Sequence, residues 1–238
     1  IIDIGDIEKA VIKFPRTRHL ANLGAATRDD LIMKSNQVNA FLGKPIWVEE
    51  KIDGANLGIS IAKDDLQIKV QNRGHYVNDE YHSQFKHLSK WISKHSTELW
   101  DILVPGRFIL YGEWVYAKHS IHYTNLSDVF VAFDLYDKYE NQFYSRSRLE
   151  TLLEKTTIAL VPSLHGEQVV FNNIEDIKAL VGGQSMFYDG PIERVYCRIC
   201  DDKWLIQRGK IVRTDFLSGD KHWSKNDLII NGVDNTEY

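Results

Sequence analysis

The spacing of apolar residues in this chain predicts many short β-strands and few helices. Leu57, Ile59 and Ile61 alternate with small or polar residues, and a period of two is typical of a strand that buries one face. The strand-like runs are residues 46–50, 56–62, 66–71, 108–114, 129–136, 168–171, 193–200, 203–207 and 211–213. Asp64 and Asp65 form a plausible hairpin turn between the second and third of these runs.

Three segments with helical spacing interrupt the strands. In residues 79–103, Phe85 and Leu88 fall on one apolar face, and a Pro-Gly pair follows the segment. Shorter helices are predicted at residues 147–155 and 173–181. Because strands and helices mix without a regular βαβ rhythm, we expect an α+β fold of antiparallel sheets flanked by helices.

The composition argues against two classes of protein. A net charge of −4 does not suit a protein that coats nucleic acid through bulk charge, and no run approaches the roughly 18 apolar residues of a membrane helix. With only 2 cysteines, the chain suits a reducing compartment, so we expect a cytoplasmic or otherwise intracellular protein. Residues 194–225 hold eight Lys and Arg against four Asp, which predicts either a phosphate-facing strip or a solvated sheet face.

A lysine between two predicted strands is the strongest candidate for chemistry. Residues 50–56 read Glu-Lys-Ile-Asp-Gly-Ala-Asn, and the Gly allows the backbone to turn tightly beside a ligand. A lysine amine with an ordinary pKa near 10.4 is neutral in only about one molecule in a thousand at physiological pH. Lys51 can therefore act as a nucleophile only if burial or positive charge lowers its pKa. Taken alone, the same segment also fits an ordinary surface turn.

Segments in order along the chain resemble the motifs of the covalent nucleotidyltransferase superfamily, which contains polynucleotide ligases and RNA capping enzymes. Residues 51–56 match its nucleophile motif, Lys-x-Asp-Gly-x-Asn. The segments similar to its later motifs are residues 72–74, 110–114, 130–134, 193–198 and 208–213. Residues 14–20, Phe-Pro-Arg-Thr-Arg-His-Leu, are similar to the opening of RNA ligases in this group. The chain therefore most closely resembles the ATP-dependent RNA ligase branch.

The resemblance implies an adenylyltransferase (nucleotidyltransferase) domain with a ligase core similar to the ATP-grasp arrangement. It implies that Lys51 bonds to AMP, that Arg208 and Lys210 supply catalytic positive charge, and that ATP comes with Mg²⁺ or Mn²⁺. Glu113 would hold the ribose hydroxyls and Phe133 would stack on the adenine. The implied nucleotide-binding residues are Glu50, Asp53, Gly54, Asn56, Arg73, Glu113, Phe133, Glu193, Arg208 and Lys210. The implied metal ligands are Glu193 and Asp53.

Two positions depart from the family's motifs. The fourth motif usually has Gly after its Glu, whereas Arg194 follows Glu193 here. Asp189, which a Gly follows, offers a second register for that acid, although the residues after it match less well. In the fifth motif Arg208 stands where Lys is usual. Because Arg does not donate a proton, only Lys210 could serve a proton-transfer role.

Each candidate also has an ordinary structural interpretation. Glu113 could be a surface carboxylate and Phe133 part of the core, while Arg208 and Lys210 could form a solvated edge. Taken together, the ordered motifs favour an ATP-dependent RNA ligase that joins RNA 3′-OH and 5′-phosphate ends through lysyl–AMP and RNA-adenylate. The alternatives are a DNA ligase core, a capping-type guanylyltransferase, and a non-catalytic protein that binds RNA ends, which Arg194 favours.

We expect one nucleotidyltransferase domain over residues 1–238. It would consist of a lead-in (1–45), a motif-bearing core (46–213) and a C-terminal tail (214–238). Only 25 residues follow Arg213, too few for the OB domain that DNA ligases and capping enzymes normally append. The expected partners are ATP and RNA ends, and we expect a monomer without membrane association.

Overall fold

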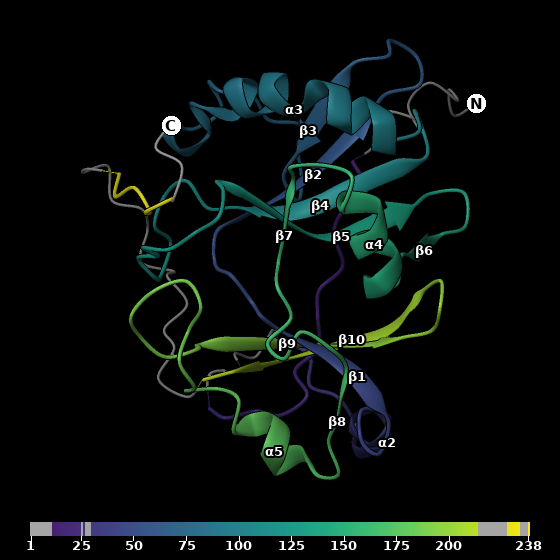
Figure 1. Cartoon of the computed structure of the whole chain (residues 1–238), viewed down its shortest axis with the longest axis vertical. Coiled ribbons are helices and arrows are strands. Elements are labelled where there is room, and N and C mark those ends of the chain that lie inside the picture. The colour runs from purple at the N-terminus through teal and green to yellow at the C-terminus, as the bar shows by residue number, and fades with distance from the viewer. Residues whose placement is uncertain (1–10, 25, 27–29, 214–227, 234–237) are drawn as a thin grey trace.

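The strands form two sheets that lie one above the other (Figure 1). The computed structural model describes residues 11–24, 26, 30–213, 228–233 and 238. One sheet has the order β3-β2-β4-β5-β6, with β7 beside β5, and the other has the order β10-β9-β1-β8. The strands of the first are β2 (Ala55–Ile61), β3 (Ile68–Gln71), β4 (Phe108–Trp114), β5 (Phe130–Asp137), β6 (Gln142–Phe143) and β7 (Ala159–Leu160). Those of the second are β1 (Pro45–Glu50), β8 (Val169–Val170), β9 (Arg194–Cys200) and β10 (Leu205–Val212).

The pairing confirms the prediction of antiparallel sheets. Every pair of named strands is antiparallel except β5 and β7. The predicted runs at residues 203–207 and 211–213 are one continuous strand, β10, with a register irregularity between Leu205 and Gln207. The alternation in β2 has the predicted cause, because Leu57, Ile59 and Ile61 all enter the core.

Helices cover the outer faces of the two sheets. They are α2 (Ser35–Asn39), α3 (Leu88–Ile102), α4 (Arg146–Leu153) and α5 (Ile174–Lys178), with a 3-10 turn, η1 (Ser83–Phe85). The predicted helix over residues 79–103 is wrong in its first part, because α3 begins only at Leu88. Asp79 Oδ1 accepts hydrogen bonds from the N–H and the hydroxyl of Ser89, at 2.7 and 2.8 Å. The residues before α3 are thereby held as a loop against its first turn.

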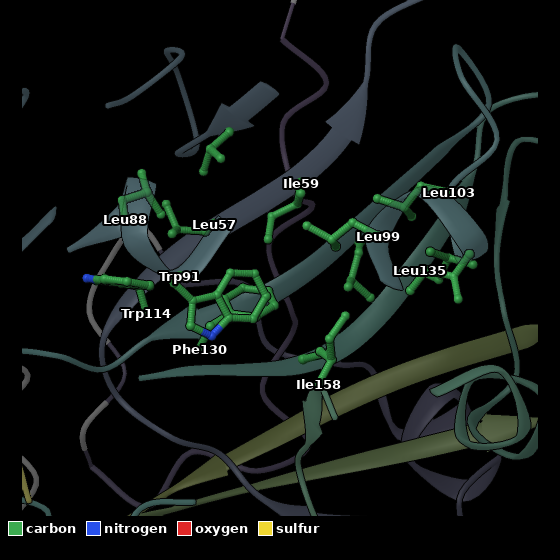
Figure 2. Close-up of a cluster of buried hydrophobic side chains, with 14 of the residues drawn as sticks. Leu57, Ile59, Leu88, Trp91, Leu99, Leu103, Trp114, Phe130, Leu135 and Ile158 are labelled. Atoms are coloured by element: carbon green, nitrogen blue, oxygen red, sulfur yellow. The ribbon is translucent and has the colours of Figure 1, made fainter. Parts of the chain in front are cut away.

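Two separate apolar cores lie between the outer faces of the sheets and the segments that cover them. The larger core packs α3 on the six-stranded sheet (Figure 2), and Trp91, Trp114 and Phe130 are among its fully buried side chains. The second core packs α5 and the segment around α2 on the four-stranded sheet, with Val48 and Cys197 among its members. Since each sheet buries its outer face in this way, the inner faces are left to face each other across the middle of the molecule (Figure 1).

The residues between the sheets are unusually polar for a protein interior. Glu49, Asp134, Arg146 and Arg198 are all buried there, and buried charges of this kind persist only when they are paired. None of the described helices is long and apolar enough to cross a membrane.

Candidate functional site

A cavity of about 340 Å³ lies between the inner faces of the two sheets. Side chains from β1, β9 and β10 line one side, and those from β2, β4 and β5 line the other. Its apolar lining includes Ile52, Val131, Phe133 and Val161, and its charged lining includes Lys51, Arg73, Glu113 and Lys210. The combination suits a ligand with a flat apolar part and an anionic part.

Lys51 stands where this cavity meets a second, more open one of about 570 Å³. It directly follows β1, and its N–H donates to the carbonyl of Arg194 at 2.9 Å, which extends the β1–β9 pairing by one residue. Burial and the charge of Arg194 lower the pKa of Lys51 to about 8, against the opposite effect of Glu113 and Asp53. A pKa lowered in this way increases the fraction of neutral amine, which is the form that a lysine nucleophile requires.

Glu113 holds the loop that follows Lys51 in place through a hydrogen bond. Its Oε1 accepts a hydrogen bond from the N–H of Gly54 at 3.0 Å, and burial raises its pKa despite the nearby ammonium of Lys51. Glu113 lies opposite Asn56 in the β2–β4 pairing, and both line the two cavities. The buried Oδ1 of Asn56 has no hydrogen-bond donor among the described residues, which leaves an acceptor available to a ligand.

A β-bulge directs Phe133 into the cavity. Tyr111 pairs with Asp134, whereas the next residue, Gly112, pairs with Ala132, so Phe133 is the extra residue in β5. Bulges redirect side chains, and here two consecutive residues, Phe133 and Asp134, both reach the space between the sheets. The ring of Phe133 is only partly buried and meets the ring of Phe14 edge-on at 5.3 Å.

A buried network of ion pairs joins the two sheets beside the cavity, which Glu49 and Arg198 help to line. Arg198 of β9 donates to Glu49 of β1 at 3.0 Å and to Asp134 of β5 at 2.7 Å. Arg146 of α4 makes a second ion pair with Glu49. Arg198 also donates to the carbonyl of Phe133 at 3.0 Å. The network therefore fixes both the distance between the sheets and the bulge that carries Phe133.

The structure places the two predicted catalytic cations differently. Lys210 lines the cavity and lies 3.7 Å from Asp30, and burial lowers its pKa in spite of that carboxylate. Arg208 lies outside the lining of both cavities. It donates to Asp134 at 3.0 Å, and its guanidinium stands over the rings of Phe14 and Phe143. Arg208 thus pairs with Asp134 on the inner face of the sheets, and Arg198 is the arginine of this strand pair that lines the cavity. The catalytic role of Arg208 stays a prediction.

Two further predicted ligand-binding residues differ in how far they are available. Arg73 lines both cavities close to Lys51. Glu50 also lines the cavity, but its carboxylate accepts hydrogen bonds from the hydroxyl of Ser185 at 2.6 Å and the N–H of Met186 at 3.1 Å. Burial raises the pKa of Glu50 against these hydrogen bonds. We therefore retain Arg73 as a ligand-binding candidate and regard the Glu50 side chain as an anchor for the loop around Ser185.

The two predicted metal ligands do not fit a metal site in this arrangement. Asp53 Oδ1 lies 2.5 Å from Nη2 of Arg194, and Oδ2 accepts from the N–H of Ser120 at 2.9 Å. Burial opposes ionisation of Asp53, but Arg194 and Ser120 outweigh it and hold its pKa well below the usual range. Glu193 lines neither cavity and is paired with Arg213 at 3.0 Å. Throughout the described part of the chain, no three His, Cys, Asp or Glu side chains gather as a metal site.

Several residues that shape the site were not predicted from the sequence. The hydroxyl of Tyr123 accepts a hydrogen bond from the N–H of Asp53 at 2.9 Å. The N–H of Tyr123 in turn donates a hydrogen bond to Oδ1 of Asn231 at 3.0 Å. The tail thereby supports the loop after Lys51. Phe14 and Arg16 also line the cavity. Phe14 and Arg16 lie in the opening segment, whose similarity to RNA ligases was the available signal, whereas nothing in the local sequence marks Tyr123 or Asn231.

The predicted basic strip at residues 194–225 is largely not a surface feature. Its arginines at 194, 198, 208 and 213 pair with Asp53, Glu49, Asp134 and Glu193. Lys203 is exposed, and the lysines at 221 and 225 lie outside the described residues. The charge of this segment therefore acts mainly inside the protein.

Taken together, the geometry supports attack on an anionic centre. The amine of Lys51, with its lowered pKa, lies where a partly apolar cavity meets a second, more open one. Arg73 and Lys210 belong to the charged lining of the first cavity. Cations held at such a place stabilise negative charge that develops during the transfer of a phosphoryl group.

Comparisons with known proteins agree with this geometry. The sequence profile of a family described as RNA ligase matches residues 44–211. A search of curated proteins gives no match. Among solved structures, an RNA ligase of Naegleria gruberi with PPi is similar, with a TM-score of 0.64 and 20% identity over 89% of this chain and 58% of that chain.

Mutants of the same ligase are also similar. A lysine-to-alanine mutant with ATP and Mn has a TM-score of 0.60 and 19% identity, over 86% of this chain and 59% of that chain. A glutamate-to-alanine mutant with AMP and Mn has a TM-score of 0.61 and 18% identity, over 85% and 56% of the two chains. This chain thus spans less than two thirds of the length of these ligases, and the likeness shows that it shares the fold of their matched part.

Proposed function

We propose that this chain, which belongs to the RNA ligase family, is an ATP-dependent RNA ligase that works through an AMP adduct on Lys51. The single observation that carries the proposal is the position of the Lys51 amine, with its pKa lowered to about 8, at the junction of the two cavities. The similar structures of the Naegleria gruberi RNA ligase contain ATP and Mn, AMP and Mn, or PPi. They support ATP as the substrate and a divalent ion as the cofactor.

In the first step, Nζ of Lys51 attacks the α-phosphorus of ATP. The bond between that phosphorus and the pyrophosphate breaks, the amine loses a proton, and lysyl–AMP forms. Arg73 and Lys210 would hold the phosphate oxygens, and the adenine would enter the apolar side beside Phe133, where stacking is worth about 1–3 kcal/mol. Glu113 and the open acceptor of Asn56 would take the ribose hydroxyls. The divalent ion would travel with the triphosphate, as Mg²⁺ commonly does.

The second and third steps transfer AMP and then release it. An oxygen of the RNA 5′-phosphate attacks the phosphorus of lysyl–AMP and frees the amine of Lys51. The RNA 3′-OH then attacks the activated 5′-phosphate, a phosphodiester forms, and AMP leaves. The open cavity, which Arg73 and Lys51 both line, is the approach that we assign to the RNA ends. A single nucleotidyltransferase domain that acts as an intracellular monomer is part of the proposal.

Labelled ATP tests the proposal in two stages. Wild-type protein with α-labelled ATP and Mg²⁺ or Mn²⁺ should acquire a covalent label, and Lys51→Ala should not. Addition of 5′-phosphorylated RNA should then move the label to RNA and give a sealed product. Labelling from GTP would instead indicate a capping-type guanylyltransferase, and sealing of DNA in preference to RNA would indicate a DNA ligase. Binding of RNA ends without any label would indicate a non-catalytic protein.

A further inference from the structure

Both oxygens of the Asp53 carboxylate have a partner within the protein. Nη2 of Arg194 lies 2.5 Å from Oδ1, and the N–H of Ser120 donates to Oδ2 at 2.9 Å. The side chains of Arg194 and Asp53 are only 14% and 15% exposed, so water screens their attraction weakly. An ion that bound Asp53 would have to displace this guanidinium.

Arg194 is also fixed by the sheet. It is the first residue of β9, where it pairs with Val212 of β10, and its carbonyl accepts the N–H of Lys51 at 2.9 Å. Arg194 thus lies next to the nucleophile across the strand pair, and its charge is one of the causes that lower the pKa of Lys51. The position is therefore held by backbone contacts on both sides, not by the flexible side chain alone.

The neighbouring acid is not available either. Glu193 points to Arg213, with 3.0 Å between the paired atoms, and lines neither cavity. An ion at Asp53 would therefore lie beside a guanidinium of the same charge sign, without Glu193 as a second carboxylate ligand. Divalent ions bind through several oxygen ligands, and the guanidinium of Arg194 repels such an ion and pairs with one of the two oxygens that Asp53 could offer it.

We propose that Arg194 takes the place of a metal ion at Asp53, so that the positive charge beside Lys51 is built into the chain and a divalent ion enters only with the triphosphate. Arg194 is a positioning residue, because its ion pair with Asp53 holds the loop that follows Lys51. The part of the inference that concerns the triphosphate rests on the proposed function, whereas the part that concerns Asp53 is independent of it.

Binding of Mn²⁺ in the absence of ATP tests this inference, with electron paramagnetic resonance or calorimetry as the readout. The wild-type protein should have no Mn²⁺ site that depends on Asp53. Arg194→Gly should gain such a site. Its Mn²⁺ affinity should exceed that of the wild-type protein by about 10-fold or more, the size of effect that a change beside a metal ligand commonly has. The double variant Arg194→Gly with Asp53→Asn should lose it again, and Arg194→Lys, which keeps the cation, should gain none.

A matched control removes an arginine from another carboxylate. Arg107 pairs with the buried Asp137 at 2.7 Å, away from both cavities, so Arg107→Gly should gain no Mn²⁺ site. Two results would overturn the inference: a wild-type Mn²⁺ site that Asp53→Asn abolishes, or a folded Arg194→Gly protein without a new site. The wild-type arm decides the question even if Arg194→Gly does not fold. A chain that forms no lysyl–AMP would refute the proposed function and leave the Mn²⁺ result intact.

Discussion

The N–H of Gly54 donates a hydrogen bond to Oε1 of Glu113 at 3.0 Å, and this contact ties the loop of Lys51 to the strand that faces the cavity. The approach is so close that a Cβ on Gly54 would collide with the backbone carbonyl oxygen of Trp114. Because a backbone atom cannot turn aside as a flexible side chain can, the loop keeps its position only with glycine.

Gly54→Ala should therefore abolish lysyl–AMP formation, because the loop must move away from β4. Gly74→Ala is the matched control, since Gly74 is also a motif glycine but a Cβ there would meet no atom within 4 Å. Labelling with ATP should be lost in the first variant and stay within about 2-fold of wild type in the second, as expected for a substitution without steric conflict. Equal labelling of both variants would contradict the contact.

The rate of lysyl–AMP formation should rise with pH and then level off near pH 8. Burial and Arg194 lower the pKa of Lys51 to about 8, and only the neutral amine attacks. The rate should thus increase about tenfold per pH unit below that value and change little above it. Single-turnover labelling between pH 6 and 10 measures the profile. A rate that keeps rising to pH 10 would mean that Lys51 has an ordinary pKa.

Removal of Arg198 should destabilise the protein strongly. Arg198→Met leaves Glu49 and Asp134 buried with part of their charge uncompensated, which commonly costs about 3–5 kcal/mol. Urea denaturation measures the free energy of unfolding. Lys178→Ala removes a surface ion pair with Glu175 and should cost no more than about 1 kcal/mol. Similar losses in both variants would argue against the network as the main link between the sheets.

Phe133→Ala should raise the KM for ATP more than it lowers kcat. Loss of a stacking partner worth about 1–3 kcal/mol corresponds to a rise of roughly 5- to 150-fold. Tyr139→Ala, which changes a ring that is 62% exposed outside both cavities, should leave KM unchanged. An unchanged KM in Phe133→Ala would show that the adenine lies elsewhere.

Local patterns were sufficient to predict most of the strands and to single out Lys51, which lies at the junction of the two cavities. The period of two in residues 56–62 marks β2 because Leu57, Ile59 and Ile61 face one core. The order of the motifs placed Lys51, Asn56, Arg73 and Glu113 at one site, and these four residues line both cavities. Such features depend on neighbours in the sequence or on motif order, so they can be read without a structure.

The remaining features depend on contacts between the two sheets. Arg198 and Arg208 lie opposite each other in the β9–β10 pairing, so the sequence alone does not reveal which of them lines the cavity. Both arginines donate to Asp134, which the bulge in β5 turns inward together with Phe133, and only Arg198 lines the cavity. The end of the loop before α3 was missed for a different reason, because a side-chain contact between Asp79 and Ser89 outside the sheets sets it.

The central claim is that the amine of Lys51 becomes bonded to AMP, and peptide mapping by mass spectrometry tests it most directly. Wild-type protein is incubated with ATP and Mg²⁺ and digested at neutral or basic pH, because a phosphoramidate is labile in acid. The peptide that contains Lys51 should carry the mass of one AMP, and fragmentation should place that mass on Lys51. An AMP adduct on a different side chain such as Lys210, or no adduct on any peptide, would contradict the account.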